Sequence, residues 1–352
     1  MSKTLSQLLK LKYPLIQAPM AGVATPELAA AVSNAGGLGS IGIGASSAEQ
    51  AEAMIHKPAA LTSAPFNVNV FCHQSEPCDP TVAQRWIERF RPVFTRFNTT
   101  PPATLAEIYT SFLDNTAVLE VLLRTKPAVV SFHFGLPSAA VLQRLKAHGI
   151  ITLASATCLV EAQAIESAGV DFVIAQGIEA GGHRGIFDPK GDDQALSTFT
   201  LVQVIRQHCQ IPVIAAGGIM DGAGMRAMLE LGATAVQMGT AFLLCPESAT
   251  TAGWRQALKS GLAARTTLTA AISGRPARCI SNDFCQLVAD FPSDSIPPYP
   301  YTYALGKALA SAAGAQGEGG FAAQWAGQGA ALIRELPAAN LVTLLAAEWQ
   351  AH

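Results

Sequence analysis

Eight short apolar segments recur along the chain, and stretches with helical patterns lie between them. The segments span residues 14–22, 38–44, 66–71, 128–135, 150–157, 171–177, 211–218 and 235–244. They are continuous apolar runs, which is typical of strands that are buried on both faces in a parallel sheet. The intervening stretches carry helix signals, such as the N-cap and proline pair Thr25-Pro26 and the endings HG, AG and LG.

Eight strand-helix units within about 240 residues fit a (β/α)8 TIM barrel better than a doubly wound sheet. The first strand is not followed by G-x-G-x-x-G, which argues against a Rossmann domain. Half of the 352 residues are apolar and only 14% are charged, so the chain can bury a large core. We therefore predict an α/β protein built on one TIM barrel.

Two segments are too long for this repeat. Residues 73–121 separate the third and fourth strands and are predicted to be a helical insertion. Residues 249–352 follow the eighth strand and contain the hinge-like stretch PSDSIPPYP; they are predicted to be a helical extension that covers the barrel mouth. The barrel itself is assigned to residues 1–72 and 122–248.

Charge and cysteine usage exclude several classes of function. The net charge is −2 without a long run of either sign, so nucleic acid and anionic membranes are not expected partners. No apolar stretch approaches eighteen residues, and the first residues lack the features of a signal peptide. The seven cysteines form no CxxC pair, which predicts reduced thiols, a cytoplasmic location and no metal site.

Active sites of TIM barrels form where the strands end, so the residues at these positions are candidates. Those predicted to bind a cofactor are Met20, Ala21, Gly22, Asn69, Gln176, Gly181, Gly217, Gly218, Gln237, Met238, Gly239 and Thr240. The small residues after the seventh and eighth strands predict a phosphate site, because bare backbone N–H groups can approach phosphate oxygens there. The alternative is that the glycines only form tight turns.

Two amides and a small-residue turn refine the expected ligand. Asn69 and Gln176 can each donate and accept hydrogen bonds, which suits the edge of a heterocycle. The alternative for both is a buried amide that satisfies backbone groups. Ala21-Gly22 leaves room for a planar ring. Together with the phosphate site, these features describe flavin mononucleotide (FMN) better than a simple sugar phosphate.

His183 lies in the stretch QGIEAGGHRG (176–185), directly after a strand. The preceding glycines let its loop bend close over a ring, and an imidazole can donate a hydrogen bond or transfer a proton near neutral pH. The alternative is a structural histidine, which is the stronger interpretation for His133 inside an apolar strand. The remaining five are predicted to lie at the surface or at helix ends: His56, His73, His148, His208 and His352.

The extension contains the stretch PYPYTYALGK (298–307). Tyr303 and Lys307 are four residues apart and share one helix face, and Tyr299 precedes a proline just outside the helix. Two phenols and one ammonium group would suit a small anion. The alternative is an aromatic helix face packed in the core, with a lysine that reaches solvent.

The ordered motifs QAPMAGVATPELAAAVSNAGGLGSIG, FNVNVF, SFHFGLP, QGIEAGGHRG, IPVIAAGGI and GATAVQMGTAF resemble those of class I nitronate monooxygenases, the 2-nitropropane dioxygenase family. The likeness covers residues 14–245 and extends into YPYTYALGKAL. AAGGI alone is common among FMN barrels, whereas the whole set with EAGGHRG is specific.

This resemblance implies a non-covalently bound FMN and His183 as the active-site histidine. Residues implied to contact FMN are Asn69, Gln176, Gly181, Gly218 and the four residues from Gln237 to Thr240. The residues implied or proposed to bind substrate are Tyr109, His133, Tyr299, Tyr303 and Lys307. Tyr109 lies in the predicted insertion, away from the barrel motifs.

The implied activity is the oxidation of alkyl nitronates, such as propionate 3-nitronate, by O2 to a carbonyl product and nitrite, which would detoxify them. An NAD(P)H-dependent FMN reductase of the enoyl-carrier-protein or quinone reductase type is the main alternative. A flavin-free sugar-phosphate lyase or isomerase and a non-catalytic phosphate-ligand binder are further alternatives. The expected partners are a small anionic nitronate and O2, and the protein is expected to be a monomer or homodimer.

Overall fold

The computed structural model describes residues 4–351, so the first three residues and His352 lie outside the described part. Eight parallel strands form one sheet in the order β1-β9-β8-β6-β5-β4-β3-β2. Their bounds are β1 Leu15–Gln17, β2 Gly39–Gly42, β3 Phe66–Phe71, β4 Val129–His133, β5 Ile151–Ala156, β6 Phe172–Gln176, β8 Val213–Ala216 and β9 Ala235–Met238. The backbone N–H of Gln17 donates to Leu38 O over 2.9 Å where β1 meets β2, and this contact closes the sheet into a barrel. The predicted (β/α)8 barrel is confirmed.

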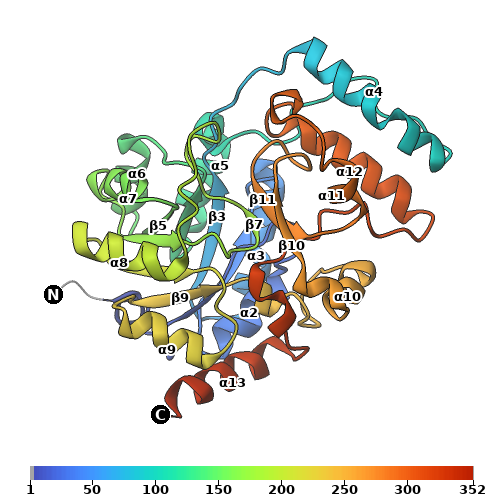
Figure 1. Ribbon diagram of the computed structural model, residues 1–352. Coiled ribbons are helices and arrows are strands. Elements are labelled where there is room, and N and C mark those ends of the chain that lie inside the picture. Colours follow the sequence, from blue (N-terminus) through green and yellow to red (C-terminus); the bar gives the residue numbers. More distant parts are fainter. Residues whose placement is uncertain (1–3, 352) are drawn as a thin grey trace.

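Helices surround these strands, as Figure 1 shows. Those that connect consecutive barrel strands are α2 Pro26–Asn34, α3 Ala48–Leu61, α5 Thr116–Thr125, α6 Ala139–Ala147, α7 Leu159–Ser167, α8 Thr198–His208 and α9 Gly222–Glu230. The Thr25 side chain accepts from Leu28 N at the start of α2, and Pro26 occupies the first turn, as the sequence predicts.

The inside of the barrel is filled by apolar side chains from the strands. Fully buried members of this cluster include Ile16, Leu153, Phe172 and Ile214, and Leu5 from α1 (Leu5–Leu9) packs with them. In β3 the alternate residues Phe66, Val68 and Val70 instead belong to the layer shared with the helices. The two asparagines between them therefore face the barrel interior, as the strand period requires.

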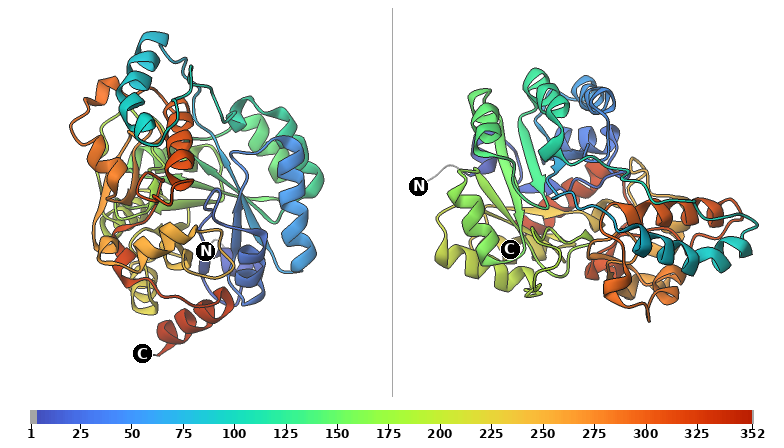
Figure 2. Two further views of the ribbon diagram at one scale, coloured as in Figure 1. Left: turned by 90° about the vertical axis from the view of Figure 1, so that its right-hand side faces the viewer. Right: turned by 90° about the horizontal axis from the view of Figure 1, so that it is seen from above.

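The segment between β3 and β4 contains α4 Pro80–Arg96, the 3-10 turn η1 Phe112–Asp114 and α5. Helix α4 lies away from the barrel and packs beside α12 Tyr301–Gly314, as both views of Figure 2 show. Trp86 and Phe90 of α4 share one buried cluster with Leu305 and Leu309 of α12. This cluster joins the segment before β4 to the chain after β9.

The chain after β9 contains strands as well as helices. Its elements are η2 Thr240–Phe242, α10 Ala252–Leu258, η3 Gly261–Ala264, β10 Thr266–Thr269, β11 Ala277–Ile280, α11 Asp283–Leu287, η4 Ser293–Ser295, α12, η5 Gln328–Leu332 and α13 Ala338–Gln350. Strands β10 and β11 form a three-stranded antiparallel sheet with the short β7 Gly182–His183. Helix α13 returns to the barrel flank and packs against α2 and α9. The domain boundaries at residues 72, 122 and 249 stay a prediction.

Two further features bear on the sequence predictions. None of the helices within residues 4–351 combines the length and the apolar character needed to cross a membrane. All seven cysteines are free thiols.

The barrel cluster allows a stability prediction. Phe172 is 1% exposed, so we expect Phe172→Ala to lower the free energy of unfolding by about 3–5 kcal/mol, because the truncation leaves a cavity. Phe199→Ala is the matched control, because Phe199 is 54% exposed on α8 and should cost little. Urea unfolding monitored by circular dichroism measures both. Equal losses for the two variants would contradict the assigned core.

Candidate active site

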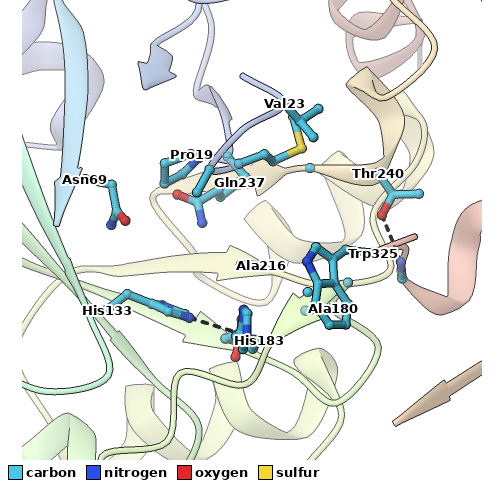
Figure 3. A pocket seen from close by; sticks show the side chains of 18 of the residues that line it. Pro19, Val23, Asn69, His133, Ala180, His183, Ala216, Gln237, Thr240 and Trp325 are labelled. Atoms are coloured by element: carbon cyan, nitrogen blue, oxygen red, sulfur yellow. Dashed lines mark hydrogen bonds between the residues drawn. The ribbon is translucent and has the colours of Figure 1, made fainter. Parts of the chain in front are cut away.

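A cavity of about 420 Å³ opens at the carboxyl ends of the barrel strands. Its lining includes every residue that the sequence analysis assigned to a site: Met20, Ala21, Gly22, Asn69, Tyr109, His133, Gln176, Gly181, His183, Gly217, Gly218, Gln237, Met238, Gly239, Thr240, Tyr299, Tyr303 and Lys307. Figure 3 shows several of them around the cavity. The structure thus brings these residues together; the role of each stays a prediction.

Glycines form one side of the cavity, where three loops meet. Gly217 and Gly218 adopt φ angles of 124° and 70°, which L side chains rarely tolerate. At Gly181 a Cβ would lie 2.4 Å from Gly327 N, so only glycine fits. Gly327 N in turn donates to Thr240 Oγ1 over 2.9 Å (Figure 3). This side of the cavity is therefore lined by backbone rather than by bulky side chains.

The amide side chains differ in how much hydrogen-bonding capacity they keep free. Asn69 Nδ2 donates to the carbonyl and hydroxyl oxygens of Ser131, at 3.1 and 2.9 Å. Both ends of the Gln176 amide are used by the loop that carries His183. Gln237 Oε1, by contrast, is buried without a hydrogen-bond partner. A buried unpaired acceptor costs about 1–3 kcal/mol, so Gln237 is the amide that most requires a ligand.

The loop after β6 is fixed through the carbonyl oxygen of His183. This oxygen accepts from Gln176 Nε2 at 3.0 Å and from His133 Nε2 at 3.2 Å. Gln176 Oε1 accepts from Gly185 N at 2.7 Å. Behind the loop, the buried Arg184 forms an ion pair with Asp193 at 2.9 Å. The candidate catalytic ring therefore stands on a loop anchored at several points.

The His183 ring is oriented from the opposite side by the chain after β9. His183 pairs with Ala277 in β11, and its Nε2 lies 2.9 Å from Ser273 Oγ. The Ser273 hydroxyl donates its one hydrogen to Arg275 O at 3.1 Å. If this hydrogen were turned toward the imidazole, a buried carbonyl would lose that bond at a cost of about 1–3 kcal/mol. Nε2 is therefore the donor to Ser273, and Nδ1 carries the lone pair.

Both histidines of the cavity are neutral near pH 7. Burial, followed by the neighbouring His133 and Arg275, lowers the pKa of His183 to about 3. Burial also lowers the pKa of His133 to about 4, against the hydrogen bond to the His183 carbonyl, which raises it. Because a lowered histidine pKa favours the uncharged ring, neither imidazole supplies positive charge at neutral pH.

Three phenols and one ammonium group form the wall opposite the glycines. Lys307 Nζ lies 4.9 Å from the Tyr109 ring centroid and 5.3 Å from that of Tyr303, one helical turn away on α12. The rings of Tyr109 and Tyr299 are 6.1 Å apart. Burial raises the pKa of Tyr109 and of Tyr303 to about 12, and that of Tyr299 well above 10. The phenols are therefore neutral hydrogen-bond donors.

Sequence reasoning missed three residues that shape the site: Trp325, Ser273 and Arg184. Trp325 lines the cavity with its ring 5.1 Å from His183. It follows α12 and forms an isolated antiparallel bridge with Cys279 of β11, and no local sequence pattern marks it. Arg184 belongs to the quoted EAGGHRG motif, and its ion pair with Asp193 became visible only in the structure.

The prediction for His73 was wrong. Its side chain is fully buried, with its ring 4.9 Å from that of Tyr299. His73 follows β3, and the chain after β9 covers it. His56, His148 and His208 are exposed as predicted, and His352 lies outside the described residues.

Comparison with known proteins shows the family of this chain. A family model described as nitronate monooxygenase matches residues 2–348. The chain is 56% identical to a nitronate monooxygenase of Paraburkholderia phytofirmans, over 98% of this chain and 94% of that protein. It is 52% identical to one of Pseudomonas aeruginosa, over 99% of both.

A solved structure shares the fold of this chain. The fold superimposes on a nitroalkane oxidase of Streptomyces ansochromogenes with a TM-score of 0.90 and 40% identity, over 99% of this chain and 98% of that one. The family model and both relatives match almost the whole chain. The chain is therefore an enzyme that belongs to the nitronate monooxygenase family.

Proposed function

We propose that this enzyme binds FMN and oxidises alkyl nitronates with O2 to a carbonyl product and nitrite. The observation that carries the proposal is the charge of the cavity. Among the described residues that line it, Lys307 is the one charged side chain, and the lining includes no carboxylate. A cavity of this kind favours a small anion held against neutral donors.

The residues opposite Lys307 fit FMN. The glycine turns at Gly217-Gly218 and Gly239 would leave backbone N–H groups free to approach the phosphate, and the unpartnered Gln237 Oε1 would accept an N–H of the flavin ring. Gln176 would contact FMN mainly by packing, because both ends of its amide already bond protein groups. Asn69 donates its Nδ2 hydrogens to Ser131, so its Oδ1 would be the end that accepts from FMN. Bound FMN would supply the electron transfer from the nitronate to O2.

The state of His183 favours a substrate that is already an anion. A neutral nitroalkane must lose a proton, and the free lone pair on Nδ1 could accept it. A base with a pKa of about 3 is poorly matched to that task at neutral pH, because general bases work best with a pKa near the working pH. A nitronate needs no proton removal, so the low basicity of His183 is no handicap.

The tyrosine and lysine wall would hold the nitronate. The Lys307 ammonium would attract its negative charge, and the hydroxyls of Tyr109, Tyr299 and Tyr303 would donate to its oxygens. His133 would support this arrangement from behind, because both of its ring nitrogens bond protein groups. Trp325 would shield the cavity beside His183 and limit access of water.

The physiological role proposed here is the detoxification of nitronates such as propionate 3-nitronate. The free thiols suit a reducing compartment, so we place the enzyme in the cytoplasm. We further propose that it acts as a monomer or homodimer.

The proposed activity is tested with the purified protein. We expect a yellow protein that releases FMN on denaturation, and that consumes O2 and forms nitrite when propionate 3-nitronate is added. A mass spectrum of the released pigment, an oxygen electrode and a nitrite assay measure these outcomes. Rapid NAD(P)H oxidation without nitrite formation would instead select the FMN reductase, and a colourless protein that does not take up FMN would refute both.

Lys307 allows a sharper test of anion binding. We expect Lys307→Met to raise the KM for a nitronate about tenfold, because a hydrogen bond to a charged group contributes about 1.5–3 kcal/mol and the exposure of Lys307 to solvent keeps the loss at the lower end. Lys146→Met on the outer face of α6 removes the same charge far from the cavity and is the control. Steady-state kinetics at constant ionic strength measure both. An unchanged KM in Lys307→Met would rule out the proposed contact.

The protonation states predict the pH dependence. Because the pKa of His183 is about 3 and those of Tyr109 and Tyr303 are about 12, none of the three titrates between pH 6 and 9. We therefore expect no inflection from these groups in kcat/KM for a preformed nitronate over this range. An inflection near pH 6.5 that disappears in His183→Asn would contradict the neutral state of the ring.

The same variant tests whether His183 serves turnover. His183→Asn should lower kcat/KM about tenfold or more at every pH, because the ring packs against Tyr299 and Trp325 and helps to position these cavity side chains, and misplaced positioning groups can cost about 100-fold. Nitrite formation measures the loss. Wild-type rates in the variant would remove His183 from the mechanism.

A further inference from the structure

Arg275 carries a charge that the mechanism above does not use. It lies in the turn between β10 and β11 and is 3% exposed. One guanidinium nitrogen donates to Ile186 O, while its Nε has no hydrogen-bond partner. Within residues 4–351 it forms no ion pair. A buried cation without a counter-charge is unfavourable, so its retention requires an explanation.

A second buried arginine in the same region shows how a protein usually neutralises such a charge. Arg184 is 1% exposed, and its guanidinium forms an ion pair with Asp193 at 2.9 Å. It also donates to the carbonyl oxygens of Gln176 and Gly177. Arg184 is thus neutralised by the protein itself. Arg275 has no such directly paired carboxylate, so its positive charge can also act on whatever occupies the neighbouring cavity.

Phe134 links Arg275 to the cavity wall. The guanidinium carbon lies 4.4 Å from the Phe134 ring centroid, a cation–π contact. The same ring lies 4.5 Å from His133, and 5.6 Å from both His183 and Tyr299. The guanidinium is therefore one aromatic ring behind three residues that line the cavity.

The backbone of Phe134 is held in an unfavourable conformation. Its φ is 74°, in the left-handed region that bulky residues avoid, and it is 1% exposed. Strain of this kind persists where the surrounding structure imposes it, and it is concentrated at functional sites. Here the strained residue is the one that separates Arg275 from the cavity.

Burial lowers the pKa of Arg275, and the more distant carboxylates of Asp188, Glu161 and Glu76 act against this lowering. In the described part of the chain none of them forms an ion pair with it. The groups nearest the shared aromatic ring are His73, His133, His183 and Tyr299, and all four are uncharged at neutral pH because burial shifts their pKa values away from the charged forms. The charge of Arg275 itself persists, since burial lowers its pKa only to about 10. A bound anion would add a negative charge on the cavity side of Arg275.

We propose that Arg275 determines specificity by making the cavity prefer an anionic ligand over a neutral one of the same shape, acting at a distance through the Phe134 ring. It is a positioning residue, because it does not touch the ligand. The inference rests on the proposed function for the identity of the anion, and it adds a second source of positive potential to that of Lys307. Low dielectric around the buried guanidinium lets its field reach the cavity with little screening.

The test compares an anion with a neutral molecule of similar shape. Isothermal titration calorimetry measures the Kd of inorganic nitrite and of neutral nitroethane for the FMN-loaded wild type, Arg275→Met and Arg275→Lys. We expect Arg275→Met to weaken nitrite binding about tenfold and to change nitroethane binding less than twofold. Arg275→Lys should restore most of the nitrite affinity, since it keeps the charge.

The control variant is Arg85→Met, which removes one positive charge from an exposed position on α4. It should leave both affinities unchanged. Circular dichroism and thermal unfolding establish that each variant is folded, and Arg275→Gln replaces Arg275→Met if the latter is not.

The outcomes separate this inference from the proposed function. Equal losses for nitrite and nitroethane in Arg275→Met would mean that Arg275 is merely structural and would overturn the inference. Unchanged nitrite binding would overturn it as well. If the wild type turns over nitronates and Arg275→Met gives either of these results, only this inference is refuted. If the wild type does not turn over nitronates, the proposed function is refuted.

Discussion

The carbonyl oxygen of His183 accepts hydrogen bonds from Gln176 and His133, which come from the ends of two barrel strands. This shared acceptor fixes the loop, and pairing of the same residue with Ala277 then attaches the chain after β9 to the barrel. The cavity wall is built on that attachment, because the tyrosines and lysine of the extension face the glycine turns only when the two parts are joined. The position of one backbone group thus governs both the barrel part and the extension part of the cavity wall.

Much of the fold follows from the sequence because a strand buried on both faces must be apolar throughout. Phe172-Val173-Ile174-Ala175 has one set of side chains inside the barrel and the other against the helices, so neither can be polar. The predicted residues at strand ends gather in one cavity for an equally general reason: parallel strands in a closed barrel all end on the same side. Periodicity and topology alone carry these inferences.

Other parts of the site cannot be recognised from the local sequence. Ser273 acquires its partner through a bond to His183, ninety residues earlier in the chain, and Trp325 reaches the cavity from the segment after α12. His73 is polar and follows a strand, so it resembles a surface residue until the extension covers it. Gln176 lines the cavity as predicted and also bonds backbone groups of the loop that carries His183, so the contact with a ligand stays a prediction. Contacts between distant segments decide such cases.

The placement of α13 has a consequence for how the enzyme is made. This helix covers α2 and α9, with Leu341, Val342 and Leu345 fully buried against the barrel. Met238 ends the last barrel strand, whereas Ala338 begins α13, so a ribosome must synthesise the whole intervening segment before the covering helix emerges. Until then the apolar faces of α2 and α9 on the nascent barrel stay uncovered. Truncation before residue 338 would leave these faces exposed, and large exposed apolar patches favour self-association.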